Sequence, residues 1–304
     1  MKTKKQNGEQ NIIKSECGIA LILTLVILTI LTAMVIEFSY NVYTTTASLK
    51  NWHNSQRLSL VSRSGISLAV KTISDIPQNE LYRIPPKIAI PVSDILSDFQ
   101  GNIIVNVEDE NSRFNLNSII HENQILNRDA YNLFKRLLKN LGLPEELADN
   151  VADWIDKDKE PRRLDSEEGA KNSSLESIDE LLLIKGFNEE IYIKLIPYIT
   201  VYPIDRANPQ LININTASET VIISIADGIT KELAQKIILA RPFQNVSDVE
   251  RIAQGLGLGP TKIVVKPSNF RIISIAEESN IKRVIESVIE IRGDSNIIRY
   301  WKET

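Results

Sequence analysis

The sequence predicts an α+β fold, in which an N-terminal transmembrane helix precedes an α/β domain that is interrupted by an all-helical insertion. An uncharged apolar run over residues 18–36 predicts the transmembrane helix. Patterns typical of β-strands occur at 101–119 and again at 266–304, and a helical stretch over 120–265 separates them. Because strands on both sides of a helical stretch can share one sheet, we expect a single domain with a helical insertion.

The run from Gly18 to Ile36 is long enough to cross a bilayer. As an α-helix its 19 residues span roughly 28 Å, close to the thickness of the hydrocarbon core. Its threonine hydroxyls can donate to helix carbonyls and so remain satisfied in lipid. The alternative is a buried helix of a soluble core, but such helices are usually shorter and carry a polar edge. We therefore expect a membrane span over residues 19–39.

The charges on either side of this run predict its orientation. Residues 1–18 carry four lysines and two glutamates, whereas the first charge after the run is Glu37. By the positive-inside rule the N-terminus stays in the cytoplasm and the rest of the chain is exported. The flank after the run lacks the small-residue cleavage site of a secretory signal peptide, and Tyr40 and Tyr43 lie where an aromatic belt is expected. The run is therefore expected to be a retained single-pass anchor.

The composition offers little material for catalysis. The formal net charge of −4 disfavours long-range attraction to nucleic acid. Cys17 is the single cysteine, and His53 and His121 lie far apart, without the spacing of a metal site or a catalytic triad. The sequence contains no nucleophile elbow and no Walker loop. We therefore expect that the protein is not an enzyme.

After the anchor, the helix is expected to continue to residue 74, because 41–74 contains no proline and has an amphipathic helical pattern. Four prolines then predict a loop over 75–99, with an edge strand at 88–90. Alternating apolar residues predict a hairpin over 101–119, with its turn near 110–112. The helical stretch and the last strands follow, with helices expected at 129–141, 145–155, 178–183, 189–196, 217–225 and 231–240, and strands at 270–276, 281–291 and 296–301. The helix at 217–225 is expected to be capped by Asn215 and Thr216.

The acidic loop that follows Trp154 is the best candidate for a metal site. Its candidate ligands lie at the offsets 1, 3, 5 and 12 of a calcium-binding loop, namely Asp156, Asp158, Glu160 and Glu167. Carboxylate oxygens without a nearby histidine or cysteine favour Ca²⁺ over zinc. Pro161 stands at the position where such loops carry glycine. A solvated acidic loop, balanced by Arg162 and Arg163, is the alternative that remains open.

A passage at 211–259 resembles the helix-hairpin-helix modules of competence and repair proteins, and 181–196 resembles a weaker copy. Such modules bind DNA by directing backbone N–H groups at a phosphate. Here Asp227 stands where DNA-binding copies have proline, and Thr230 where they have a second glycine. Because a carboxylate repels phosphate, we expect a structural role. A membrane-tethered helix-hairpin-helix DNA-binding protein of the competence type remains the alternative function.

The start of the apolar run resembles the prepilin leader of type IV pilins and type II secretion pseudopilins. A polar, lysine-bearing leader over residues 1–18 ends in Gly18 and directly abuts the helix. The resemblance implies that a prepilin peptidase cuts between Gly18 and Ile19 and that Ile19 becomes N-methylated. Leu23 stands where most members carry glutamate, and in this family the missing glutamate is characteristic of the large minor pseudopilin K. A carboxylate in the bilayer needs a partner, so its absence suits the tip of a filament.

The resemblance to the K subunit covers nearly the whole chain and includes an acidic turn followed by the Asn-Leu-Asn sequence at 115–117. It implies a pilin-like domain formed by 75–119 and 266–304, with an inserted helical domain at 120–265 that contains helix-hairpin-helix (SAM-like) elements. It also implies calcium in the insertion, and it adds Asp165 and Glu168 to Glu167 as an acidic cluster.

By resemblance, the expected function is that of a minor pseudopilin at the tip of the type II secretion pseudopilus. Such a subunit supports assembly of the pseudopilus and export of folded proteins across the outer membrane. The implied location is the inner membrane, with the C-terminal domain in the periplasm. The implied partners are the minor pseudopilins I and J, with H as a further candidate, and the prepilin peptidase; no nucleic acid is expected.

Overall fold

The computed structural model describes residues 3–90, 99, 101–158, 160–163, 166–204, 211–278, 280–292 and 295–304. The chain divides into two units, Met1–Arg57 and Leu58–Thr304. A single long helix, α1 (Thr3–Ser74), runs through the first unit and into the second, as expected from the unbroken helical pattern.

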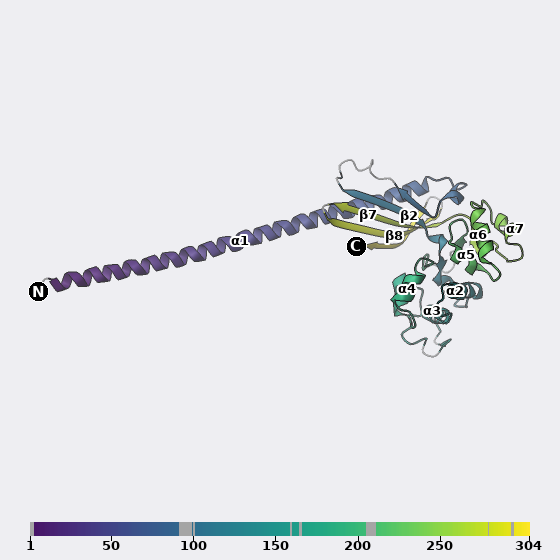
Figure 1. Ribbon diagram of the computed structural model, residues 1–304, viewed down its shortest axis with the longest axis horizontal. Helices are drawn as coiled ribbons and strands as arrows, with labels where there is room; N and C mark the ends of the chain where they lie inside the picture. The colour runs from purple at the N-terminus through teal and green to yellow at the C-terminus, as the bar shows by residue number, and fades with distance from the viewer. Residues whose placement is uncertain are drawn as a thin grey trace. The chain divides into compact units, whose positions relative to one another are not determined.

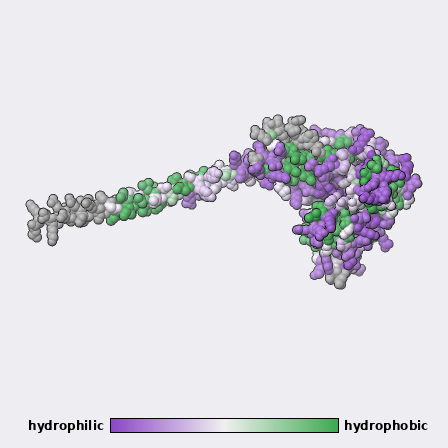
Figure 2. Space-filling view, in the orientation of Figure 1, coloured by the Kyte–Doolittle hydropathy of each residue, from purple (hydrophilic) through white to green (hydrophobic). Residues whose placement is uncertain are grey.

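The apolar part of α1 is a candidate membrane span. Among the residues that the structure describes, one helix is long and apolar enough to cross a bilayer, and it is this one, from Gly18 onward. Figure 2 shows a hydrophobic surface along this part of the helix and a less hydrophobic surface further along it. The threonine hydroxyls donate to carbonyls of the preceding turn, as expected: Thr24 to Leu21 at 2.8 Å, Thr29 to Val26 at 2.8 Å and Thr32 to Leu28 at 2.7 Å.

The second unit is built on a five-stranded antiparallel sheet with the strand order β1-β2-β7-β8-β9 (Figure 1). The strands are β1 (Lys87–Ile90), β2 (Asn102–Asp109), β7 (Asn269–Glu278), β8 (Ile281–Arg292) and β9 (Ser295–Glu303). β2 precedes the helical stretch and β7 follows it, yet the two strands pair along their length, with Val105 opposite Ser274. The two ends of the chain's second unit therefore share one sheet, as the sequence predicts.

The last turns of α1 pack on this sheet. Ile66, Ala69 and Ile73 form a buried cluster with side chains of β2, β7 and β8, among them Val105, Val107, Phe270, Ile272 and Ile285. The helix comes close to the strands at Gly65, where an added Cβ would lie 2.4 Å from the Ser274 hydroxyl. A glycine is therefore needed at this crossing, because any side chain would push the helix away from the sheet.

Between β2 and β7 the chain forms short helices and a second core. The α-helices are α2 (Arg128–Asn140), α3 (Leu147–Ile155), α4 (Glu189–Leu195), α5 (Glu219–Ile225), α6 (Lys231–Leu239) and α7 (Val246–Ile252). The 3-10 helices of this stretch are η2 (Glu110–Ser112), η3 (Leu116–Ile119) and η4 (Ile178–Leu183), and a further one, η1 (Leu81–Arg83), precedes β1. Buried side chains of α2 to α7, η3 and η4 form one continuous cluster that includes Phe134, Leu137, Ile155 and Ile222. Leu81 of η1 belongs instead to the cluster between α1 and the sheet.

The expectation of an all-helical insertion is wrong in detail. β3 (Phe114–Asn115) pairs in parallel with β4 (Ile199–Thr200), and β5 (Ile212–Asn213) pairs in parallel with β6 (Ile263–Val264). Each pair consists of two residues per strand and is fully or mostly buried. Strands this short carry no alternating pattern that could be detected from the sequence.

The hairpin expected over 101–119 is also wrong. β2 pairs with β1 and β7 and not with the following segment, which leaves the sheet and joins β4 instead. The Asn115 side chain accepts a hydrogen bond from the backbone N–H of Asn117 at 2.9 Å, and this contact turns the chain into η3. The apolar residues that suggested a strand are buried in the helical core instead.

The cap expected at Asn215 and Thr216 is wrong as well, since Ser218 caps α5 by accepting a hydrogen bond from the backbone N–H of Val221 at 3.3 Å. Asn215 has another role. Its side chain is buried, accepts from the N–H of Phe243 at 2.8 Å and donates to the carbonyl of Val265 at 2.8 Å. It therefore joins segments that are far apart in the sequence.

The turn that leaves the sheet after β2, Asp109–Asn111, ties the helical core to the sheet, and we name it the junction turn. All three side chains are buried. Asp109 accepts hydrogen bonds from Asn213 at 2.7 Å and from Thr216. Glu110 accepts from Thr200 at 2.6 Å and from Arg271 at 2.7 and 2.9 Å.

Asn111 completes the junction turn by accepting hydrogen bonds from the backbone N–H groups of Ser268 and Asn269, at 2.9 and 2.8 Å. These residues lie at the start of β7, where the chain returns to the sheet. Three consecutive residues thus fasten β4, β5 and β7 to the end of β2.

The two carboxyl groups of the junction turn titrate in opposite directions. Burial acts to raise the pKa of Glu110, but Arg271 and Arg113 outweigh it and hold this pKa at about 2. Burial raises the pKa of Asp109 to about 6, although Thr216 and Asn213 donate hydrogen bonds to it. The Glu110 interaction therefore contributes stability above pH 4.5 that is lost as the pH falls through about 2. The Asp109 carboxyl favours folding most below pH 3.8, and this contribution is lost as the pH rises through about 6.

Replacing Glu110 tests the junction turn. We expect Glu110→Gln to lower the free energy of unfolding at pH 7 by about 3 kcal/mol, because Arg271 and Arg113 both lose a fully buried carboxylate partner, although Arg271 keeps Glu286 and Arg113 keeps Glu108. The variant should also lose less stability than the native chain between pH 4.5 and pH 2. Both quantities can be measured by chemical denaturation at several pH values.

The matched control is Glu190→Gln, which removes an exposed carboxylate from a pair with Lys194 on α4 and should leave unfolding unchanged. A Glu110→Gln variant with native stability and a native pH profile would show that this buried pair does not hold the junction.

Candidate metal centre

The candidate site begins at the last turn of α3. The buried residues of this helix include Asp153 and Trp154, and Asp156 follows as the C-cap residue. Because residues three apart lie on the same side of a helix, Asp153 and Asp156 present their carboxylates to the same side of the helix end. Both side chains are fully buried. Two neighbouring buried carboxylates repel each other unless a cation lies between them.

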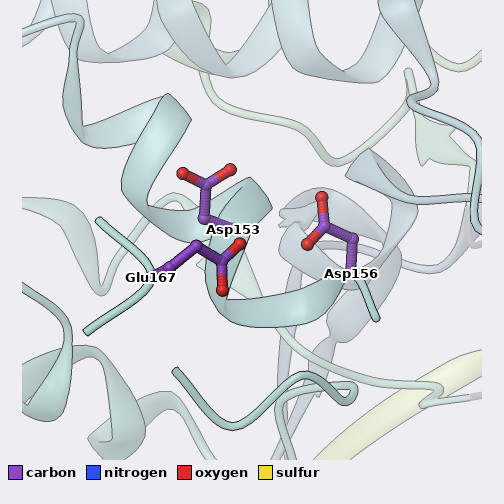
Figure 3. A group of neighbouring side chains, drawn as sticks. All are labelled: Asp153, Asp156 and Glu167. Carbon is purple, nitrogen blue, oxygen red and sulfur yellow. The ribbon is translucent and has the colours of Figure 1, made fainter. Parts of the chain in front are cut away.

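The loop after α3 returns to the helix end and adds a third carboxylate. A turn over residues 166–169 places Glu167 opposite the two aspartates, as Figure 3 shows. One oxygen from each of Asp153, Asp156 and Glu167 lies within 4.8 Å of the others. We name these three residues the carboxylate cluster.

Arg162 lies on the same loop and contacts the carboxylate cluster directly. Its Nη1 donates to Oδ1 of Asp153 and to Oδ2 of Asp156. Its backbone N–H donates to Oδ2 of Asp153 at 2.9 Å, and the Ser166 hydroxyl also contacts this oxygen. The oxygens of Asp153 are therefore satisfied by the chain itself.

Three other oxygens of the carboxylate cluster are not satisfied in this way. Oδ1 of Asp156 and both carboxylate oxygens of Glu167 are buried and have no hydrogen-bond partner among the residues that the structure describes. Burial raises the pKa of Glu167, and the charges of Asp153 and Asp156 raise it further. Burial also raises the pKa of Asp156, although Arg162 acts against it. Unpaired buried carboxylate oxygens that face one another are the donor set that a hard divalent cation prefers.

The structure brings together only part of the ligand set expected from the sequence. Asp156 and Glu167 belong to the carboxylate cluster. Asp158, Glu160 and Glu168 are exposed and lie outside it, and Asp158 accepts a hydrogen bond from the backbone of Glu160 at 2.9 Å. Asp165 lies outside the described residues. The ligand spacing of a calcium-binding loop, which the sequence suggested, therefore does not match the set of carboxylates that the structure brings together.

Asp153 is the residue that the sequence analysis missed. The signal that could have found it is its spacing of three residues from Asp156 at the end of a helix, which places two carboxylates on one side.

The expected processing residues lie within α1. Gly18 and Ile19 are exposed, and the space around Gly18 is open, with no atom within 4 Å of an added Cβ. The helix continues through both residues.

The hairpin considered for DNA binding connects α5 to α6 and is held by a side chain from α2. Arg136 donates to the carbonyls of Ser224 and Ile225, both at 2.8 Å. Asp227 lies at the tip of the hairpin, and its side chain is 91% exposed. An exposed carboxylate at the tip opposes the approach of a phosphate, and the arginine is engaged in holding α5.

Comparison with protein families gives two matches. Residues 112–204 and residues 212–266 each match a family model for protein K of the type II secretion system. Together these regions include the carboxylate cluster, β3 to β5 and α2 to α7.

Comparison with individual proteins agrees. The chain is 30% identical over 234 residues to the type II secretion system protein K of Pseudomonas aeruginosa, which covers 69% of this chain and 67% of the relative. It is 28% identical to the protein K of Aeromonas hydrophila, over 64% of this chain and 68% of the relative. The fold also matches that of one chain in a solved complex of GspK, GspI and GspJ from the type 2 secretion system of enterotoxigenic Escherichia coli. The TM-score is 0.61 and the identity 21%, over 85% of this chain and 99% of the matched chain. These comparisons give no support to the DNA-binding alternative.

Proposed function

The chain belongs to the protein K family of type II secretion systems, a family of minor pseudopilins, and we propose that it forms the tip of the pseudopilus. At the tip it would support assembly of the pseudopilus and export of folded proteins across the outer membrane. It acts by association with other subunits and not by bond chemistry.

The observation that carries the tip position is the anchor without a carboxylate. From Gly18 the helix has no charged residue before Glu37, and Leu23 presents an exposed apolar side chain. An ionised group within a bilayer is costly unless it meets a partner, such as the amine of a neighbouring subunit. A subunit without the carboxylate needs no neighbour to neutralise it and can therefore end the filament.

The anchor also supports a location. A single apolar helix suits a single-pass protein, and the lysines before it favour a cytoplasmic N-terminus. The unit from Leu58 to Thr304 would then lie in the periplasm, anchored in the inner membrane by α1.

The partners that fit this role are the minor pseudopilins I and J, with H as a further candidate. The supporting observation is the fold match to a chain of the GspK-GspI-GspJ complex. The exposed apolar side chains of α1 offer a packing surface to other anchors within the membrane.

Co-purification tests the proposed position. We expect the chain, produced in membranes with its cognate subunits I and J, to elute with both as one complex. The control is the major pseudopilin, which should not bind the chain when I and J are absent. Retention on DNA at low salt without association to I or J would instead favour the tethered DNA-binding protein.

We also propose that a prepilin peptidase cuts between Gly18 and Ile19 and that Ile19 is then N-methylated. Produced with the peptidase, the chain should have the intact mass of residues 19–304 plus one methyl group. Gly18→Val should keep the leader, because a branched side chain fills the open space beside the cut. The matched control is Gly8→Val, which lies within the leader and should be processed normally. A native chain that keeps residues 1–18 in the presence of an active peptidase would contradict this proposal.

The carboxylate cluster fits a structural calcium ion. Its oxygens are hard donors, and three of them are buried without a partner among the described residues. Asp153, Asp156 and Glu167 would hold the ion, and its charge would offset the repulsion between them. Bound calcium would thereby hold the turn at Glu167 against the end of α3. Exported proteins meet enough calcium for weak sites to be occupied.

Two adjacent glutamates provide a test of the calcium site. We expect calcium to stabilise the native chain by about 2.7 kcal/mol at a concentration of about 100 times its Kd. Glu167→Gln should lose this stabilisation, because it removes a charge from the carboxylate cluster. Glu168→Gln should keep it, since Glu168 is exposed and lies outside the cluster. Thermal unfolding with EGTA, calcium or magnesium measures the effect, and equal behaviour of the two variants would reject the cluster as the site.

A further inference from the structure

Arg162 occupies the position that a cation bridging the carboxylate cluster would take. Its Nη1 contacts one oxygen of Asp153 and one oxygen of Asp156 at the same time. An ion that joins these two carboxylates must approach Oδ1 of Asp153, because the second oxygen of Asp153 is already engaged by the backbone N–H of Arg162 and by Ser166. Nη1 of Arg162 contacts this same Oδ1, so the guanidinium nitrogen and the ion compete for it.

The charges of the cluster are not balanced by Arg162 alone. Three carboxylates face a single guanidinium, and Oδ1 of the fully buried Asp156 is left without a partner among the described residues. Both oxygens of Glu167 are also unpaired within the part of the chain that the structure describes. One guanidinium thus holds the two aspartates together but leaves the third carboxylate unsatisfied, which a divalent ion with more coordination positions would correct.

The side chain of Arg162 is able to leave the cluster without opening the loop. It is 25% exposed, whereas the side chains of Asp153 and Asp156 are almost fully buried, so the guanidinium lies at the solvent side of the cluster. The backbone N–H of Arg162 donates to Asp153 independently of the side chain. The loop can therefore stay attached to α3 through this N–H and through Ser166 while the guanidinium turns outward.

We propose that Arg162 is a built-in competitor of the cation, which holds the carboxylate cluster together when no ion is bound and is displaced when calcium binds. This inference rests on the proposed calcium site and adds its regulation. Because the ion must displace a positive charge from two buried carboxylates, its affinity is set low. The site would then fill only where calcium is abundant, and the folded loop would persist without it.

Neutralising the arginine tests the competition, and the next residue provides the control. Arg162→Gln and Arg163→Gln remove the same charge from adjacent positions of one loop, but Arg163 is exposed and does not contact the carboxylate cluster. Calcium binding to the full chain in detergent can be measured by isothermal titration calorimetry. We expect Arg162→Gln to bind calcium at least about tenfold more tightly than the native chain, and Arg163→Gln to bind with near-native affinity.

Thermal unfolding supplies a second readout. In EGTA, Arg162→Gln should have a lower Tm than the native chain, since the aspartates lose their only counter-charge within the described part of the cluster. Saturating calcium should remove this difference. If Arg162→Gln does not fold in EGTA, calcium should restore its fold, and failure of calcium to do so would overturn the proposal.

The outcomes separate this inference from the calcium site itself. Calcium binding by the native chain with equal or weaker binding by Arg162→Gln would overturn the competition and leave the site intact. Binding by Arg162→Gln alone would show that calcium does not displace Arg162, and it would overturn both the displacement and the calcium site of the native chain. Absence of binding in both chains would overturn the site and the competition together.

Discussion

The buried pairing of Glu110 with Arg271 is the constraint on which the rest of the second unit depends. The helical stretch is inserted between two neighbouring strands of one sheet, so its two ends must be held at the same place. The junction turn, Asp109–Asn111, meets this requirement with three consecutive buried side chains that together bond to β4, β5 and β7. Apolar contacts alone would not specify how the insertion is oriented relative to the sheet, because hydrophobic burial is not directional. Buried hydrogen bonds and ion pairs specify this orientation, but they bury charges that must remain paired.

The same principle recurs in the insertion at the end of α3. Here three carboxylates converge with one arginine, and the balance of charge is incomplete. At the junction turn every oxygen of Glu110 has a donor, whereas the carboxylate cluster keeps three buried oxygens without one in the described part of the chain. The interactions of Glu110 are therefore complete within the chain and need no added ligand. The carboxylate cluster is suited to the calcium ion that we propose, and this contrast favours a cation site over a solvated acidic loop.

The architecture agrees with the proposed function, in which the chain acts by association with other subunits. The first unit is a helix with an apolar exposed surface, and the second carries a sheet on which the last turns of the same helix pack. Gly65 allows the close approach of helix and sheet. One helix, α1, contributes residues to both units.

The sequence by itself determined the long helix with its apolar candidate span, the sheet strands at both ends of the second unit and the helices α2, α3 and α6, because each has a strong pattern of apolar residues. It also identified the acidic loop and two members of the carboxylate cluster, Asp156 and Glu167. Tertiary structure decided which segments pair. Phe114 and Asn115 join β4 and not β2, because β7 takes the place beside β2, and such a choice depends on segments more than a hundred residues apart. It also placed Glu167 beside Asp153 and Asp156, since only the packing of the returning loop against α3 brings Glu167 to this helix end, and no local spacing encodes that approach.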